Sequence, residues 1–288
     1  MKKSPRIVSP DEAVSVIKSG DSLYLSGFAN SPELLVEALC RRGDAGELQD
    51  VRIVQLMTFG KAPYTDARYA GIFVPDAFFA GANNRQSIRE GVSDYLPVGL
   101  SDTEKLYRSG VFKCDVALIK VTKPDVHGYV SLGVSVDITL AAVETARTVI
   151  AVVDEKAPRT LGDSLIPYSM IDYAVMDNHP LMEIINPPPT ELDIAIGRNC
   201  ASLIDNGACL QMGIGSIPNA ILSALKDHSD LGIHTEMFSD NVIPLVEEGI
   251  INGVRKQIDR GKLVTSFMMG SQKFYDFIDN NPLVLMKD

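Results

Sequence analysis

Short apolar runs alternate with segments whose apolar positions recur at helical spacing along the whole chain. Alternation of this kind is typical of an α/β fold, in which helices connect neighbouring parallel strands. The pattern predicts strands at residues 22–25, 51–57, 71–74, 116–121, 128–131 and 149–153, and helices at 11–19, 33–42, 85–90, 102–108 and 138–146.

One strand, helix and strand segment brings together two features that could take part in binding or catalysis. The apolar run 208–212 predicts a buried strand that stops at Gly213, the segment 217–225 has helical spacing, and a second strand ends at Glu236. A strand, helix and strand joined in this way pair in parallel and place both carboxyl ends on one edge. We therefore expect the Gly213 loop and Glu236 to be neighbours in the crevice where open α/β sheets bind ligands.

The later part of the chain repeats the beginning. Residues 22–27 and 208–213 are both apolar runs ending in glycine, and a proline and an Ala-Leu pair follow each run at the same spacing. One constant offset of 186 positions relates the two, because Ala208 corresponds to Ser22. Repeats of this kind indicate two related halves of one protein.

The proline-rich run 186–190 separates the two halves. We predict a first α/β domain at residues 1–186 and the amino-terminal part of a second α/β domain at residues 187–288. The ending 281–286 has the character of a strand that enters a sheet. If the second half were as long as the first, the protein would continue past residue 288, so we expect the second domain to be incomplete.

Composition excludes several classes of protein. The 288 residues are 45% hydrophobic and 22% charged, as in soluble globular proteins. A net charge of −10 argues against nucleic-acid binding, which needs a basic surface. No apolar run approaches the roughly 20 residues of a membrane span, and residues 1–5 do not begin a signal peptide. Cysteine spacing indicates a reduced, cytoplasmic chain with core cysteines at Cys40, Cys114, Cys200 and Cys209.

Glu236 is the candidate catalytic residue. Its strand is apolar, Phe238 follows it, and a glycine loop with an amide-rich helix start is its expected neighbour. A carboxylate in that place can attack an activated acyl group, while loop amides stabilise the developing oxyanion. A glutamate at a strand end is otherwise an ordinary solvated surface residue.

The remaining motifs do not match known functional sites. The run Gly213-Ile214-Gly215 lacks the third glycine of a dinucleotide fingerprint, and His234-Thr235-Glu236 lacks the cysteine pair of a zinc deaminase. His127 and His179 are dispersed, so no metal site is predicted. Residues 125–133 contain two glycines, which indicate either close approach to a ligand or a tight hairpin. The small residues before Arg85 similarly fit a substrate-facing loop or a simple turn.

Three motifs together, at residues 125–133, 213–218 and 231–236, resemble the acetyl-CoA hydrolase/transferase family. The chain is most similar to its 4-hydroxybutyrate and butyryl-CoA:acetate CoA-transferases. The resemblance implies a class I CoA-transferase-like fold of two similar open α/β domains with the active site between them. It also implies that Glu236 is the catalytic glutamate and that coenzyme A is contacted by Gly213, Ile214, Gly215, Ser216 and Ile217.

The implied activity moves CoA between an acyl-CoA, such as 4-hydroxybutyryl-, butyryl- or acetyl-CoA, and a short-chain carboxylate such as acetate. The route is ping-pong through a glutamyl-CoA thioester on Glu236, with CoA as substrate and with no prosthetic group or metal. Acyl-CoA hydrolysis and a catalytically inactive binding module are the alternatives. The resemblance also implies a homodimer. Family members carry a Gly-Gly-Gln element beyond the length of this chain, so we expect weak or absent turnover from the chain alone.

Overall fold

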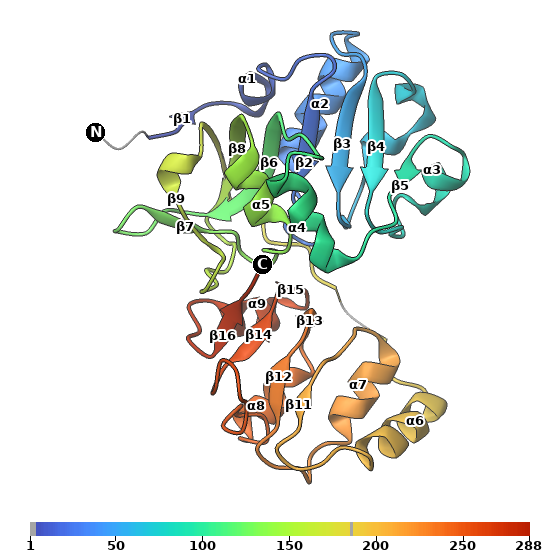
Figure 1. Cartoon of the computed structure of the whole chain (residues 1–288), viewed down its shortest axis with the longest axis vertical. Helices are drawn as coiled ribbons and strands as arrows, with labels where there is room; N and C mark the ends of the chain where they lie inside the picture. Colours follow the sequence, from blue (N-terminus) through green and yellow to red (C-terminus); the bar gives the residue numbers. More distant parts are fainter. Residues whose placement is uncertain (1–3, 185–186) are drawn as a thin grey trace. The chain divides into compact units, whose positions relative to one another are not determined.

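The computed structural model describes residues 4–184 and 187–288, and its α/β architecture confirms the predicted fold class (Figure 1). Two compact units divide the chain. The first holds the residues up to Ala157 together with 164–182 and Asp288, and the second holds 158–163 together with 183–287. Asn186, where the domain boundary is predicted, and the start of the chain, residues 1–3, lie outside the described residues.

An eight-stranded parallel sheet forms the centre of the first unit. Strand β2 lies between β3 and β6, so Leu25 pairs with Gln55 on one side and with Leu118 on the other. The strand order therefore reverses at β2, the kind of position where open α/β sheets form ligand crevices. In spatial order the strands are β1 (Arg6–Ile7), β10 (Tyr173–Asp177), β8 (Thr148–Asp154), β6 (Val116–Thr122), β2 (Ser22–Leu25), β3 (Val51–Gln55), β4 (Phe73–Ala77) and β5 (Asp94–Tyr95).

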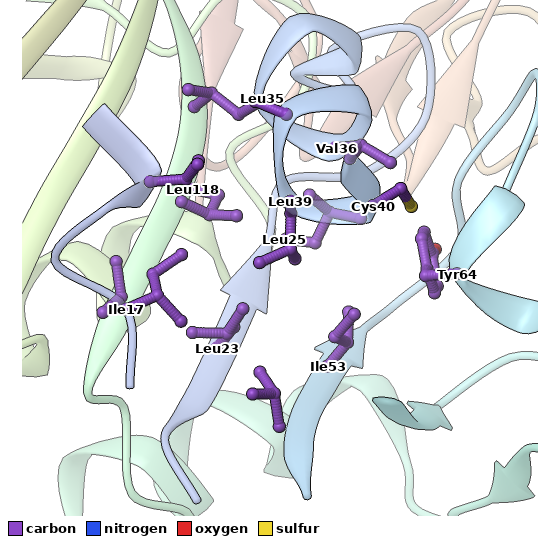
Figure 2. Packing of buried hydrophobic residues seen from close by; sticks show 14 of the residues in the cluster. Ile17, Leu23, Leu25, Leu35, Val36, Leu39, Cys40, Ile53, Tyr64 and Leu118 are labelled. Carbon is purple, nitrogen blue, oxygen red and sulfur yellow. The ribbon is translucent and has the colours of Figure 1, made fainter. Parts of the chain in front are cut away.

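Apolar side chains of helix α2 build the core of this unit against β2 (Figure 2). Leu35 and Leu39 of α2 are buried with Leu23 and Leu25 of β2 in one cluster, and Ile53 of β3 extends that cluster. Burial of one such side chain contributes about 1.5–3 kcal/mol. The cluster thus fixes α2 on the sheet and with it the loop that leaves β2. The helices of the unit are α1 (Pro10–Val14), α2 (Glu33–Asp44), α3 (Arg85–Arg89), α4 (Leu100–Arg108) and α5 (Thr139–Thr145).

Helix α1 begins as predicted and ends early. The Ser9 hydroxyl accepts a hydrogen bond from the Glu12 N–H and caps the helix start. Beyond Val14, the Ser15 hydroxyl donates to the Glu12 carbonyl, and the Asp21 carboxylate accepts from the Lys18 N–H. Side chains therefore replace the helical hydrogen bonds that an extension to residue 19 would need.

The second unit has a four-stranded parallel sheet with the order β11-β12-β14-β16. This order corresponds to β2-β3-β4-β5 of the first unit, and α6 packs on α7 as α1 packs on α2 (Figure 1). Counterparts of β6, β8 and β10 are absent from the described residues of this unit. Its elements are α6 (Glu191–Ala201), β11 (Cys209–Leu210), α7 (Ser216–Ser223), β12 (Gly232–His234), β13 (Met237–Phe238), α8 (Val242–Glu247), β14 (Leu263–Thr265), β15 (Phe267–Met268), α9 (Gln272–Ile278) and β16 (Val284–Met286).

The prediction of a buried strand at 208–212 is wrong. Strand β11 covers only Cys209–Leu210, and the Cys209 side chain is exposed. The reason is its position, because β11 pairs with β12 alone among the described residues and forms an edge of the sheet. The expectation of core cysteines holds for Cys40 and Cys114, whereas Cys200 is half-buried and Cys209 is not in the core.

Asp115 joins three segments at the amino-terminal edge of the first sheet. Its carboxylate accepts from the Ser22 N–H at 3.0 Å and lies 2.8 Å from the Lys113 ammonium and 3.8 Å from the Arg147 guanidinium. Burial by itself would raise the pKa of Asp115. The Lys113 and Ser22 hydrogen bonds and the two cationic charges outweigh burial, so the pKa is lowered.

We expect Asp115→Asn to destabilise the chain in a pH-dependent way. A lowered folded-state pKa means that the charged carboxylate stabilises the fold above its unfolded pKa of about 3.9. The contribution is lost as the pH falls through the lower, folded pKa. Hydrogen bonds to charged groups are worth about 1.5–3 kcal/mol, so the variant should melt earlier at pH 7. Melting curves from pH 7 to pH 3 test this, and a gap that stays constant would contradict it.

Candidate active site

Glu236 lies at a break between two short strands of the second unit. Strand β12 ends at His234 and β13 begins at Met237, which leaves Thr235 and Glu236 between them. The Glu236 carbonyl accepts from the N–H groups of Ser266 at 3.1 Å and Phe267 at 3.2 Å. The main chain of Glu236 is therefore fixed by the neighbouring strand.

The Thr235 hydroxyl connects this break to the predicted CoA-binding loop. Its Oγ1 accepts from the Met212 N–H at 2.8 Å and lies 2.9 Å from the Met212 carbonyl oxygen. Strands β11 and β12 pair in parallel, as the crossover predicts, with Leu210 opposite Ile233. Gly213 directly follows Met212 and Glu236 directly follows Thr235. No strand therefore separates the Gly213 loop from Glu236.

The glycine loop is open and its helix start has no side-chain cap. Gly213 and Ile214 are exposed, and Gly215 adopts a φ of +117°, which disfavours any residue with a Cβ. Helix α7 begins at Ser216, and among the described residues its start has no side-chain cap. Uncapped amides at a helix start are suited to polar and anionic groups of a ligand. The loop can therefore offer main-chain donors without a lysine.

The Glu236 carboxylate is exposed. Within the described residues no donor or cation contacts it. The flanking Thr235 and Met237 side chains are buried, so that of Glu236 points to the opposite, open side of the chain. Exposure leaves this carboxylate accessible to a bulky substrate.

Two charged residues near the site escaped the sequence reasoning. Hydrogen bonds from the Thr190 hydroxyl and N–H lower the pKa of Asp193, which also interacts with the Ser216 hydroxyl at the start of α7. The buried Lys256 ammonium donates to the carbonyls of Ile233 at 2.8 Å and Lys262 at 2.7 Å, and burial lowers its pKa. Lys256 thus supports the strand that leads to Glu236. Asp193 belongs to a Thr-x-x-Asp capping box that begins at Thr190, a pattern that the sequence offers, whereas Lys256 belongs to no motif and only the fold reveals it.

The first unit has a cavity of its own at the point where the strand order reverses. Its volume is about 290 Å³, and its wall includes Phe28 after β2, Phe59 after β3 and the buried Lys120 of β6. The Lys120 ammonium lies 3.6 Å from the Asp154 carboxylate, whose pKa is raised by burial. The small residues before Arg85, which fit a substrate-facing loop or a simple turn, do not line this cavity.

Residues 125–133 form a tight turn rather than a ligand loop. The Asp125 carboxylate accepts from the N–H groups of His127 and Tyr129, both at 2.9 Å, and β7 (Tyr129–Ser131) pairs with β9 (Leu165–Pro167). The second glycine, Gly133, has a φ of +63° and closely approaches the Asn30 amide. The structure thus shows a local turn, the strand that pairs with β7 comes from residues 165–167 and not from an adjacent hairpin strand, and the close neighbour of Gly133 is a protein side chain.

The histidines do not gather around a common point. His127, His179 and His234 are exposed, and His179 pairs with Asp177. In the described ranges, no group of three His, Cys, Asp or Glu residues has a metal-binding arrangement. Likewise, no described helix is long and apolar enough to cross a bilayer.

Comparison with known proteins identifies the class. Residues 2–186 match the family model of the acetyl-CoA hydrolase/transferase N-terminal domain. The chain is 43% identical over 279 residues to the 4-hydroxybutyrate coenzyme A transferase of Clostridium kluyveri, covering 97% of this chain and 65% of that protein. It is 34% identical to the butyryl-CoA:acetate CoA-transferase of Anaerostipes caccae, covering 96% and 63%. The chain therefore belongs to the acetyl-CoA hydrolase/transferase family, as the three motifs predicted.

Solved structures agree with this assignment. RipA from Yersinia pestis superposes with a TM-score of 0.93 at 32% identity, covering 98% of this chain and 67% of that one. The 4-hydroxybutyrate CoA-transferase of Porphyromonas gingivalis gives a TM-score of 0.87 at 36% identity, with the same coverage. The chain spans 58% to 65% of the length of the first three curated relatives it matches.

Proposed function

We propose that the protein transfers CoA between an acyl-CoA and a short-chain carboxylate, with Glu236 as the nucleophile. The observation that carries the proposal is the placement of an exposed Glu236 beside the link between Thr235 and Met212, at the start of the open Gly213 loop. Family membership supports the same chemistry, since the relatives named above are CoA-transferases.

The proposed reaction proceeds in two half-reactions. A Glu236 carboxylate oxygen attacks the thioester carbonyl carbon, the carbon–sulfur bond breaks, and CoA departs as its thiolate. An acyl-glutamyl anhydride is left on Glu236. The thiolate then attacks the glutamyl carbonyl, which releases the first acid and forms a glutamyl-CoA thioester. An incoming carboxylate then attacks the glutamyl-CoA thioester. The same steps in reverse order release the new acyl-CoA and the free Glu236 carboxylate. Main-chain N–H groups of residues 213–217 would stabilise the oxyanion or bind CoA.

Isotope exchange tests the first half-reaction. With acetyl-CoA and labelled acetate as the only substrates, we expect label to enter acetyl-CoA, because the ping-pong intermediate forms without a second acid. A glutamyl-CoA thioester should also appear by mass on the peptide that contains Glu236, and borohydride should reduce it. Absence of both signals from the intact chain would contradict the proposal.

Acyl-CoA hydrolysis is the alternative that one observation favours. The Glu236 carboxylate is exposed, so water has access to any acyl or thioester intermediate formed on it. Added acetate separates the two activities: a transferase consumes it as acceptor, whereas a hydrolase releases free CoA at an unchanged rate.

The match covers 65% of the Clostridium kluyveri relative. We propose that turnover by these 288 residues alone is weak, with CoA as a substrate and no prosthetic group. A binding module that forms no adduct is the remaining alternative, and the mass test distinguishes it. The family resemblance implies a homodimer, and sedimentation measures the oligomeric state directly. Full turnover from the intact chain would overturn the expectation of weak activity.

A further inference from the structure

The ends of β12 and β14, which are neighbours in the sheet of the second unit, have the same local arrangement around a buried threonine. The runs Thr235-Glu236-Met237-Phe238 and Thr265-Ser266-Phe267-Met268 each span a strand break, the first between β12 and β13 and the second between β14 and β15. The breaks are in register, since Met237 pairs with Phe267 across the parallel strands. Both threonines are at most 5% exposed. Sequence reasoning attached no role to either one.

Each hydroxyl links the end of the preceding strand to its own strand. Thr235 Oγ1 bonds Met212 and lies 3.1 Å from the Met237 carbonyl oxygen. Thr265 Oγ1 lies 2.9 Å from the Glu236 carbonyl oxygen and 3.0 Å from that of Phe267. One threonine therefore holds the residue before the glycine loop, and the other holds the nucleophile's own peptide group.

The two valine substitutions differ in what they leave unpaired. Without the Thr235 hydroxyl the Met212 N–H loses its acceptor, and an unpaired buried group costs about 1–3 kcal/mol. Without the Thr265 hydroxyl the Glu236 carbonyl keeps the Ser266 and Phe267 N–H donors but loses its tie to the Thr265 side chain. A valine would keep the shape and strand preference of threonine but would remove the bond. The two hydroxyls tie the ends of β11, β12 and β14 to one another. The relative positions of these strand ends along the strand direction set where the Glu236 carboxylate lies with respect to Gly213.

We propose that Thr265 and Thr235 are positioning residues for the nucleophile. Through hydrogen bonds to the Glu236 and Met212 main chain, they hold the carboxylate and the glycine loop in one register before substrate binds. The inference rests on the proposed role of Glu236 and assigns the groups that orient it. A misplacement of about 1 Å can cost about a hundredfold in rate, so small displacements have measurable effects.

Valine and serine substitutions at the same positions test the proposal. In acetyl-CoA/acetate exchange, Thr265→Val and Thr235→Val should lower the saturating rate about tenfold or more and change half-saturation less than about twofold. Thr265→Ser and Thr235→Ser keep the hydroxyl and should restore the rate. Thr103→Val is the matched control, because Thr103 is buried in α4 of the first unit and its hydroxyl bonds the Leu100 carbonyl of the same helix. A valine variant with the normal rate, or a serine variant as slow as valine, would overturn the proposal.

Hydrogen exchange decides the question independently of activity. In Thr265→Val the amides of Ser266 and Phe267, which donate to the Glu236 carbonyl, should exchange about tenfold faster than in the parent chain. Unchanged exchange at these amides would refute positioning even if the rate fell. If the parent chain shows neither label exchange nor an adduct on Glu236, the proposed function fails, and the amide measurement still supports or refutes the link between Thr265 and Glu236.

Discussion

Glu236→Ala should abolish the covalent adduct and lower CoA transfer by about a thousandfold or more, because Glu236 is the proposed nucleophile. Glu236→Gln keeps the size of the side chain and removes the charge, so it should be equally inactive. Glu236→Asp withdraws the carboxylate by one methylene and should retain a small fraction of the rate. Isotope exchange and peptide mass measure all three variants.

His234→Ala is the matched control for this set. His234 is exposed at the end of β12, two residues before Glu236, and it has no part in the proposed chemistry. Its variant should react like the parent chain and should melt at the same temperature as Glu236→Ala. An adduct that persists on another residue in Glu236→Ala would reject Glu236 as the nucleophile.

Gly162→Ala should destabilise the second unit by about 3 kcal/mol. The segment 158–163 extends the sheet beside β16, where the Met286 N–H donates to the Leu161 carbonyl and the Met286 carbonyl accepts from Asp163. Gly162 has a φ of +103°, and an added Cβ would lie 2.4 Å from the Met286 carbonyl oxygen. The backbone cannot accept that atom without separating the segment from β16.

Gly249→Ala isolates the cost of conformation from the cost of the clash. Gly249 also lies in the second unit with a φ of +75°, but its Cβ would meet no atom within 4 Å. Only the left-handed conformation is penalised there, at about 1 kcal/mol. Denaturant unfolding of both variants measures the difference, and equal losses would show that the contact with Met286 is not the cause.

The elements that the sequence predicted well are those with a long apolar run or a clear helical face. Strand β6, at Val116–Thr122, and helix α2, at Glu33–Asp44, lie within two residues of their predicted bounds. Both bury many side chains, so their patterns are strong. Strand β10, at Tyr173–Asp177, was missed because its five residues include the exposed Met176 and a terminal aspartate.

The candidate site was predictable only in part. Glu236 and the Gly213 loop follow from a strand, helix and strand that must pair in parallel, so their proximity could be reasoned from the chain. The buried Lys256 and Thr265 could not be found, because each bonds a main-chain carbonyl far away in sequence. Hydrogen bonds of this kind require no motif and leave no periodic signal.

By itself the sequence determined the α/β class, the family and the neighbouring positions of Glu236 and Gly213, since apolar spacing and short motifs are local properties. The tertiary structure alone decided that β11 is an edge strand, that the Glu236 carboxylate is exposed, and that buried threonine hydroxyls join the strand ends. The physical reason is that burial and hydrogen bonding depend on which strands lie side by side. That neighbourhood is set by the whole sheet and not by any single segment.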